Sequence, residues 1–318
     1  MQYRHLGSSG LKVSAIGLGT NQFGGKVDQQ TASAIINTAL DLGINLIDTA
    51  DTYKGGCSEE FIGKALSGRR SQAIVATKVR NRTGEGPNQA GLSRQHILDG
   101  AETSLRRLNT EYIDLYQLHS WDPDTPLEET LRALEDLLRS GKVRYIGASN
   151  FEAWQLTWAN ALAELRGWTK FVSIQPHYHM LERGIEKELI PACRYFQIGI
   201  LPYYPLAGGF LTGKYHPGEA PPSGSRGESS RYVQAYMTPI NYDILEKLRQ
   251  FAQTHGHTLN ELAHAWLLAQ PQVASVISGA TKVEQVQANA AAASWALTQE
   301  EVSQVNEILG PAEGQTGQ

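Results

Sequence analysis

Four side chains in the first half of the chain have the types and spacing that proton transfer requires. Asp48 and Tyr53 stand in the stretch 43–63, GINLIDTADTYKGGCSEEFIG, whereas Lys78 and His119 each end a later apolar run. A tyrosine hydroxyl has a solution pKa of about 10, so it needs a neighbouring cation to exchange a proton near neutral pH. We interpret Lys78 as that cation and Asp48 as the carboxylate that keeps it charged. His119 would then orient a carbonyl oxygen.

Each of these residues also has an ordinary structural interpretation. Asp48 could cap a turn, and Tyr53 could be an amphipathic surface residue. Lys78 could be a salt-bridge partner and His119 a polar residue with satisfied hydrogen bonds. Lys78 could form a Schiff base with a carbonyl substrate, a reaction that favours a lysine whose pKa is lowered by apolar surroundings or by other cations. An adjacent Asp48 argues against the Schiff base, and the joint occurrence of the four residues favours acid–base catalysis.

Short apolar runs alternate with longer segments of helical periodicity over nearly the whole chain. In the segment 127–141, for example, leucines recur every three or four residues before a glycine. Eight alternations predict a closed (β/α)₈ barrel with helices outside, formed by one domain over residues 1–318. The predicted strands are 15–20, 45–49, 73–78, 112–119, 143–150, 171–175, 198–204 and 273–278.

Three segments depart from this alternation. Apolar residues on both sides of GSSG at 7–10 predict a hairpin that could close one end of the barrel. The segment 206–240 is rich in Gly, Pro and Ser, and a loop of that length is usually functional or disordered. We expect it on the catalytic face, because it follows the seventh strand. The tail 311–318 is expected to be frayed.

Composition and charge exclude several classes of protein. The 318 residues are 41% hydrophobic, which is enough for a substantial core, and the net charge of -4 gives no basic footprint for nucleic acid. No apolar run is long enough for a membrane helix. Cys57 and Cys193 stand outside any C-x-x-C pair or His/Cys cluster, so no metal is expected. We expect a cytoplasmic protein with a small-molecule partner, and the oligomeric state stays open.

Taken together, the motifs resemble those of the aldo-keto reductases over residues 3–309. The stretch GINLIDTADTYKGGCSEEFIGKAL is similar to the first signature of that family, and SLRRLNTEYIDLYQLH is similar to the second. GKVRYIGASNF, YYPLAGGFLTGKY and ISGATKVEQVQAN resemble its cofactor-binding segments. The likeness is greatest to the bacterial branch that includes the potassium-channel β subunits. The resemblance implies carbonyl reduction by NAD(P)H, with Tyr53 as the general acid assisted by Lys78, Asp48 and His119.

No G-x-G-x-x-G motif follows a predicted strand, so a dinucleotide would lie across the barrel rim rather than in a Rossmann site. The resemblance implies that Ser149, Asn150 and Gln175 bind the nicotinamide carboxamide and that Tyr203 stacks on the nicotinamide ring. The predicted cofactor contacts are Gly19, Thr20, Asp48, Ser149, Asn150, Gln175, Tyr203, Leu206, Gly208, Lys214, Arg226, Gly279, Thr281, Lys282, Gln285 and Asn289.

Two positions depart from the family pattern. Many members have an arginine where this chain has Gln285, so recognition of a 2′-phosphate would depend more on Lys282 and the helix that begins there. We expect NADP(H) rather than NAD(H). Tyr204 stands where serine is common, and its ring would narrow a substrate pocket lined by Phe23, Tyr53, His119, Trp121, Tyr178 and Tyr204.

Such a pocket favours hydrophobic or aromatic carbonyls. The alternative function is a cofactor-sensing module like the potassium-channel β subunits, in which slow redox turnover regulates a bound partner. Turnover with carbonyl compounds would separate the two functions.

Overall fold

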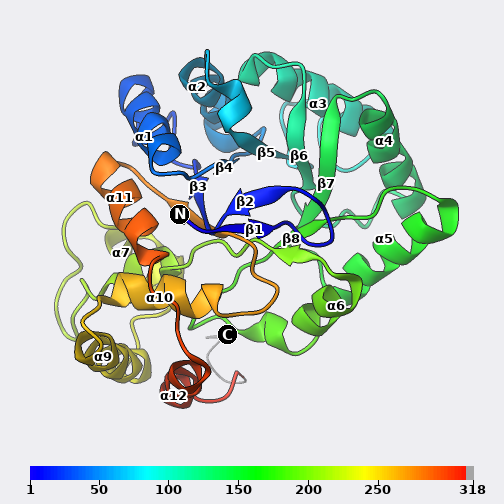
Figure 1. Cartoon of the computed structure of the whole chain (residues 1–318). Helices are drawn as coiled ribbons and strands as arrows, with labels where there is room; N and C mark the ends of the chain where they lie inside the picture. Colours follow the sequence, from blue (N-terminus) through cyan, green and yellow to red (C-terminus); the bar gives the residue numbers. More distant parts are fainter. Residues whose placement is uncertain (313–318) are drawn as a thin grey trace.

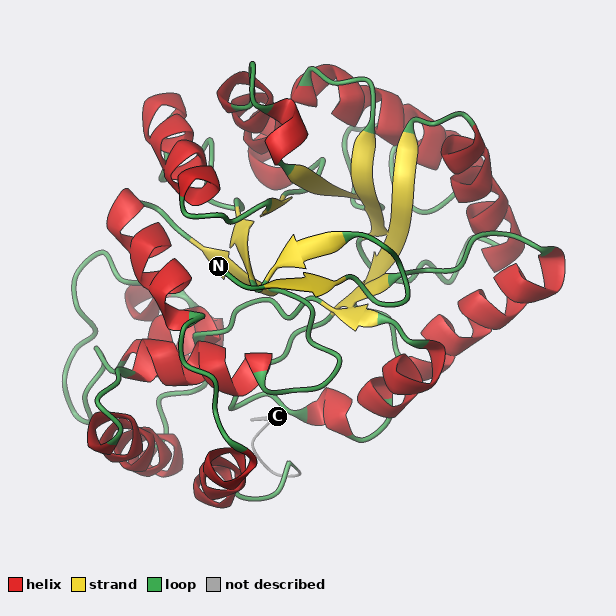
Figure 2. Ribbon diagram, in the orientation of Figure 1, coloured by secondary structure: helices red, strands yellow, loops and turns green. Residues whose placement is uncertain are grey.

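Eight parallel strands form a barrel that is surrounded by helices (Figures 1 and 2). The computed structural model describes residues 1–312, so the tail prediction falls largely on residues outside that range. The strand order is β10–β3–β4–β5–β6–β7–β8–β9, and the bridges Ile200–Val273 and Tyr203–Ile277 close the barrel between its two edge strands. The strands are β3 (Ile16–Gly19), β4 (Leu46–Asp48), β5 (Ile74–Val79), β6 (Ile113–Leu118), β7 (Val143–Ser149), β8 (Ser173–Gln175), β9 (Gly199–Ile200) and β10 (Val276–Gly279). Each predicted run contains or overlaps one of these strands, and the predicted barrel is confirmed.

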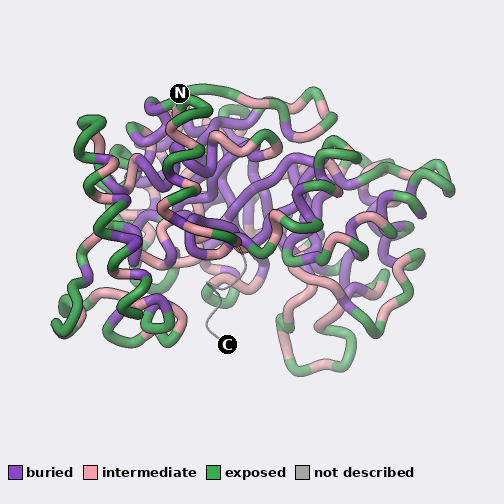
Figure 3. The backbone as a smooth tube through the Cα atoms, turned by 90° about the horizontal axis from the view of Figure 1, so that it is seen from below, coloured by how far each residue is buried: buried purple, intermediate pink, exposed green. Residues whose placement is uncertain are grey.

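The helices pack an apolar face against this barrel. In α4 (Leu127–Arg139), Leu131 and Leu134 are buried, while acidic residues in the first turn and Arg139 in the last complement the helix dipole. Figure 3 shows buried residues gathered in the middle of the molecule and exposed residues at its periphery. The other long helices are α1 (Gln29–Asp41), α2 (Cys57–Ala65), α3 (Arg94–Leu108), α5 (Ala153–Arg166), α6 (Leu189–Phe196), α9 (Pro239–Thr254), α10 (Leu259–Leu268), α11 (Val283–Ala292) and α12 (Gln299–Leu309). In the described part of the chain, no helix has the length and apolar character needed to cross a membrane.

The hairpin of β1 (Tyr3–His5) and β2 (Lys12–Ser14) lies across the amino-terminal ends of the barrel strands, as predicted (Figure 1). Leu6 and Val13 are completely buried against apolar side chains from inside the barrel. Gly7 permits this contact, because it has a φ of 58° and a Cβ there would lie 2.4 Å from the Val172 carbonyl oxygen. The hairpin therefore closes the end of the barrel opposite the carboxyl ends of the strands.

The long segment after β9 is ordered rather than structureless. It contains a 3₁₀ helix, η4 (Ala207–Thr212), and the short helices α7 (Arg226–Ser229) and α8 (Arg231–Gln234). Phe210 and Tyr215 are buried and stack on each other, and the Tyr215 hydroxyl accepts a hydrogen bond of 3.0 Å from the backbone of Gly227. The glycines and prolines of this segment thus form turns between packed aromatic residues.

Candidate active site

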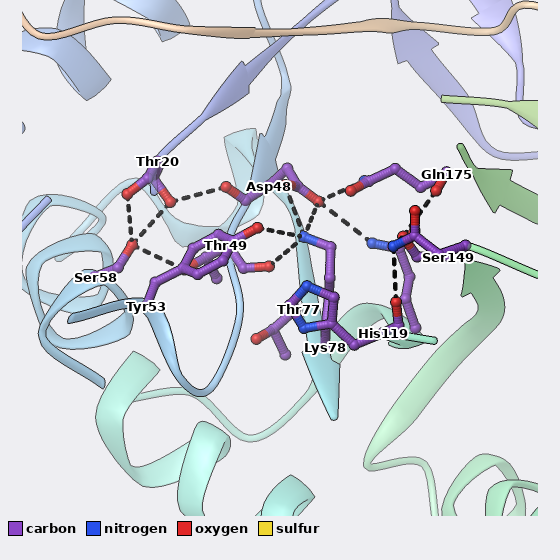
Figure 4. A network of polar contacts seen from close by, with 12 residues as sticks. Thr20, Asp48, Thr49, Tyr53, Ser58, Thr77, Lys78, His119, Ser149 and Gln175 are labelled. Atoms are coloured by element: carbon purple, nitrogen blue, oxygen red, sulfur yellow. Dashed lines mark hydrogen bonds and ion pairs between the residues drawn. The ribbon is translucent and has the colours of Figure 1, made fainter. Parts of the chain in front are cut away.

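The structure brings Asp48, Tyr53, Lys78 and His119 together at the carboxyl ends of the strands (Figure 4). Asp48 ends β4, Lys78 lies near the end of β5, and His119 follows β6, so the parallel register places all three on one rim. Tyr53 begins the 3₁₀ turn η1 (Tyr53–Gly56) that follows β4. The Lys78 Nζ lies 2.8 Å from both carboxylate oxygens of Asp48 and 3.5 Å from the Tyr53 hydroxyl.

The surroundings of Lys78 and Tyr53 set the protonation states of both side chains. Burial opposes the charge of Lys78, but Asp48 and then Tyr53 more than offset it, so the pKa of Lys78 is raised. A raised lysine pKa is the opposite of what a Schiff-base lysine requires. Burial also raises the pKa of Tyr53, and Lys78 offsets only part of that rise. Tyr53 therefore keeps its proton near neutral pH and can act as a donor.

His119 is a neutral hydrogen-bond donor in this arrangement. Burial, followed by the charges of Lys78 and Arg80, lowers the pKa of His119 to about 3. The Asn81 amide nitrogen lies 3.1 Å from Nδ1 of His119 and donates to it, which leaves the proton on Nε2. The His119 ring faces Tyr53 edge-on, with 6.0 Å between the ring centroids. A carbonyl oxygen between the two rings could accept a hydrogen bond from both.

Two residues of this network were missed by sequence reasoning. Besides Lys78, the Asp48 carboxylate accepts hydrogen bonds from the side-chain amides of Gln175, at 2.8 Å, and Gln117, at 3.3 Å. Gln117 could have been suspected, because it is a polar residue within the apolar run of β6. Asn81 follows Lys78 by only three positions. The two missed residues are thus Gln117, which orients Asp48, and Asn81, which orients His119.

The residues predicted to bind the nicotinamide carboxamide form hydrogen bonds with their neighbours. The Ser149 hydroxyl donates to the Gln175 backbone carbonyl at 2.7 Å, and the Asn150 amide donates to the His119 carbonyl at 3.1 Å. The Tyr203 hydroxyl donates to the side-chain oxygen of Asn150 at 2.9 Å. Because the Gln175 amide nitrogen is held by Asp48, its Oε1 is left to accept from an amide group such as a carboxamide.

A cavity of about 600 Å³ extends from these residues to the amino terminus of α11. Its volume lies within the range of about 300–1,000 Å³ that is usual for ligand pockets. Gly208 and Gly209 line it with φ values of 65° and 108°, and a Cβ on Gly208 would come within 2.7 Å of Val233. The predicted cofactor residues on its wall are Gly19, Thr20, Asp48, Ser149, Asn150, Gln175, Tyr203, Leu206, Gly208, Lys214, Arg226, Gly279, Thr281, Gln285 and Asn289. Lys282 is exposed beside them as the N-cap residue of α11.

The predicted substrate residues are only partly brought to this cavity. Tyr204 lines it, whereas Trp121 is half-buried and packs edge-on against Phe151. Phe23 and Tyr178 are completely buried in the core, away from the cavity wall. Tyr178 points away from the cavity and packs on Trp266 in the core, because adjacent residues in an extended segment point to opposite sides. Its hydroxyl donates to Glu186 at 2.8 Å.

The barrel and its site define an NAD(P)H-dependent oxidoreductase, and comparison with known proteins gives the family. The sequence model of the Aldo/keto reductase family matches residues 15–310, and the chain belongs to that family. It is 39% identical to the uncharacterized oxidoreductase YrpG of Bacillus subtilis, with 99% of this chain and 98% of that protein covered. It is 40% identical to a probable voltage-gated potassium channel subunit beta of Arabidopsis thaliana (91% and 90% covered) and 33% identical to the versiconal hemiacetal acetate reductase of Aspergillus parasiticus (98% of each). The resemblance seen in the sequence is confirmed.

Proposed function

We propose that this protein reduces aldehydes or ketones to alcohols with NADPH and that Tyr53 is the general acid. The observation that carries the proposal is the buried Lys78, which touches both the Asp48 carboxylate and the Tyr53 hydroxyl at the floor of the cavity. A buried ion pair placed against a protonated tyrosine serves proton transfer, because the cation stabilises the tyrosinate that remains.

The residues of the chain can be assigned to the parts of this reaction. When bound, the reduced dinucleotide supplies the hydride that attaches to the carbonyl carbon. The Nε2 proton of His119 and the hydroxyl of Tyr53 hold the carbonyl oxygen, and Tyr53 gives its proton to that oxygen as the carbon–oxygen π bond breaks. Lys78 stabilises the tyrosinate until solvent returns a proton. The same groups serve alcohol oxidation in reverse.

The adenosine end of the cavity supports NADP(H) over NAD(H). The Gln285 side chain is already engaged within the protein. Its Oε1 accepts hydrogen bonds from the backbone of Thr281 at 2.7 Å and from the Thr281 hydroxyl at 3.2 Å. Lys282 precedes the first turn of α11, whose free backbone amides favour an anion. We assign the 2′-phosphate to Lys282 and these amides.

We also propose that the enzyme accepts apolar carbonyl compounds and that it is cytoplasmic. Tyr204 on the cavity wall, with Trp121 close to His119 in sequence, supports hydrophobic or aromatic substrates. Cys57 and Cys193 are both free thiols, as expected in a reducing compartment.

The test is a panel of aliphatic, aromatic and carboxylate-bearing aldehydes and ketones, each mixed with NADPH while the reduced nicotinamide absorbance is followed. We expect turnover with some apolar members, slower turnover with NADH, and none above background for Tyr53→Phe. Cofactor binding without turnover for any carbonyl would contradict the proposal. That outcome would favour the cofactor-sensing alternative, which the likeness to channel β subunits from Arabidopsis thaliana supports.

A further inference from the structure

Two histidines and two tyrosines form a hydrogen-bonded cluster behind the cavity wall. His177 and His179 follow β8, whereas Tyr232 and Tyr236 belong to the long segment after β9. The Tyr232 hydroxyl lies 2.6 Å from Nε2 of His177 and 3.1 Å from Nε2 of His179. The Tyr236 hydroxyl lies 3.4 Å from that of Tyr232. Tyr232 is therefore the centre of the cluster and joins the long segment to the barrel.

The direction of these hydrogen bonds follows from the protonation of the two histidines. Burial lowers the pKa of His177 to about 4 and that of His179 well below its ordinary value, so both rings are neutral. The backbone amide of Leu181 donates to Nδ1 of His179 at 3.2 Å, which places the His179 proton on Nε2. His179 must then donate to the Tyr232 oxygen. The Tyr232 hydroxyl proton is left for Nε2 of His177, at the shortest distance in the cluster.

Tyr232 is linked to two walls of the predicted dinucleotide site, to one of them through His177. The His177 ring stacks on Tyr203, with centroids 5.3 Å apart and an angle of 11° between the planes. Tyr203 is the predicted platform for the nicotinamide ring. On the other side, a methyl group on Gly208 would come within 3.2 Å of the Tyr232 ring. Gly208 lines the cavity in η4, so the Tyr232 side chain supports both the platform and the segment that covers the cavity.

We propose that Tyr232 is a positioning residue that latches the segment 206–238 over the bound dinucleotide. Its hydroxyl fixes His177 behind Tyr203, and its ring supports Gly208, so the segment cannot move away without breaking this partly buried hydrogen bond. The inference rests on the dinucleotide function proposed above. A latch of this kind slows release of the cofactor and does not take part in the transfer of hydride or proton.

The first test is Tyr232→Phe, which keeps the ring and removes only the hydroxyl. The hydrogen bond to His177 is the one that links Tyr232 to the nicotinamide platform, and a neutral hydrogen bond contributes about 0.5–1.5 kcal/mol. We therefore expect NADP⁺ and NADPH to dissociate roughly 2- to 12-fold faster. Stopped-flow measurement of tryptophan fluorescence gives the dissociation rate constants, and single-turnover mixing with a carbonyl substrate gives the rate of the chemical step. The proposal requires the first change to exceed the second. A merely structural role would lower the melting temperature without this difference.

Tyr242→Phe is the matched control, because Tyr242 packs its ring on Phe210 in the same region and takes no part in the cluster. It should leave the dissociation rate constants at their wild-type values. Equal acceleration in Tyr232→Phe and Tyr242→Phe would overturn the latch, since any loss of a hydroxyl in or beside this segment would then have the same effect.

The second test removes the acceptor from the barrel side and remains available if Tyr232→Phe is poorly folded. His177→Phe keeps a ring to stack on Tyr203 and should accelerate dissociation by a similar factor, and the double variant should be no faster than either single variant. Independent, multiplying effects would overturn the proposal, as would unchanged dissociation from Tyr232→Phe. Wild-type protein that binds neither dinucleotide would instead refute the proposed function itself, and the latch with it.

Discussion

The two ends of the barrel bury different kinds of side chain between the same eight strands. At the hairpin end, Leu6 and Val13 fill the barrel interior with apolar atoms and pack on Leu46, Leu115 and Leu201. At the opposite end, which holds the proposed active site and is called the catalytic end below, Lys78 is 1% exposed and Asp48 is 3% exposed, and each is held by the other. Burying apolar surface stabilises a fold, whereas burying an ion pair contributes little or costs stability. The hairpin end therefore stabilises the fold that holds the reactive end in place.

Backbone conformation differs between the two ends in the same way. Left-handed residues other than glycine at the hairpin end are Asn109 and Gln197, which end helices α3 and α6 as ordinary caps. At the catalytic end they stand next to the reactive side chains: Lys54, Arg80, Asn150, Tyr204 and Ala207. Such conformations cost about 1–3 kcal/mol each in unfavourable cases and persist where the surroundings hold them. More of these conformations therefore lie beside the candidate active site than at the hairpin end.

The largest effect should come from removing one atom at the catalytic end. Tyr53→Phe should lower kcat/KM for carbonyl reduction by roughly 10²–10⁴-fold, because the general acid is lost. The melting temperature and cofactor affinity should change little, since the ring stays in place. Steady-state kinetics and thermal unfolding measure both, with the exposed Tyr195→Phe as the control. Wild-type turnover by Tyr53→Phe would refute the assignment of the acid.

The opposite result is expected at the hairpin end. Leu6→Ala leaves a cavity where a completely buried side chain closed the barrel, and such changes cost about 2–5 kcal/mol of unfolding free energy. The kcat of the protein that remains folded should stay near wild type. Urea unfolding followed by circular dichroism measures the loss, and Leu165→Ala, at a leucine that is 77% exposed, provides the control. A large loss of kcat in folded Leu6→Ala would show that the two ends are coupled.

The sequence predicted what depends on periodicity and register. Apolar runs located all eight strands, and Asp48, Lys78 and His119 were placed together because parallel strands end on one rim. Contacts that depend on the direction of individual side chains were harder to predict from the sequence. Tyr178 was assigned to the substrate pocket, yet it extends into the core, and the support of Asp48 by Gln117 depends on a cross-barrel contact between residues 69 positions apart.

Composition was similarly an incomplete guide to the segment 206–240. Its glycines and prolines suggested a loop without regular structure, but Phe210, Tyr215 and Val233 are buried and belong to the main hydrophobic core. The aromatic residues were visible in the sequence, whereas their mutual packing was not. Glycine and proline residues indicate where the chain turns, but they do not indicate how the turns pack against the rest of the protein.

The buried carboxyl group of Asp51 allows the loss of unfolding free energy at the catalytic end to be measured. It is 2% exposed, and neither of its carboxylate oxygens has a hydrogen-bond partner among the described residues. Burial, followed by the charge of Glu59, raises the pKa of Asp51 to about 7, compared with about 3.9 in an unfolded chain. Between these values the folded protein binds more protons, so this contribution is fully present below pH ~4 and is lost as the pH rises to about 7.

Asp51→Asn removes that pH dependence. Its unfolding free energy, relative to wild type, should rise between pH 5 and 7 by at most about 1.4 kcal/mol per pH unit. Buried histidines act in the opposite sense, but they do so in both proteins and cancel in the difference. Urea unfolding at pH 5 and pH 8 gives the comparison, with the exposed Asp124→Asn as the control. A difference between variant and wild type that does not change with pH would mean that Asp51 is ionised throughout.

The smallest effect concerns Lys282, which lies at the outer edge of the catalytic end and is exposed. Its ammonium precedes the free backbone amides of α11, so an adenosine 2′-phosphate would meet both. A hydrogen bond between charged groups contributes about 1.5–3 kcal/mol, and Lys282→Ala should therefore weaken NADPH binding by roughly 10- to 100-fold. NADH has no phosphate at that position and should bind almost as before.

Fluorescence titration of both cofactors against wild type and Lys282→Ala measures this selectivity directly. Lys12→Ala is the matched control, because Lys12 is an exposed lysine at the hairpin end and its loss changes the net charge by the same amount. A purely long-range effect of charge would weaken NADPH binding in both variants and would fade as salt is added. A local contact weakens it in Lys282→Ala alone. Equal small changes for NADPH and NADH would show that the 2′-phosphate is not bound at Lys282. The charged residues that act at this end would then be the buried ones alone.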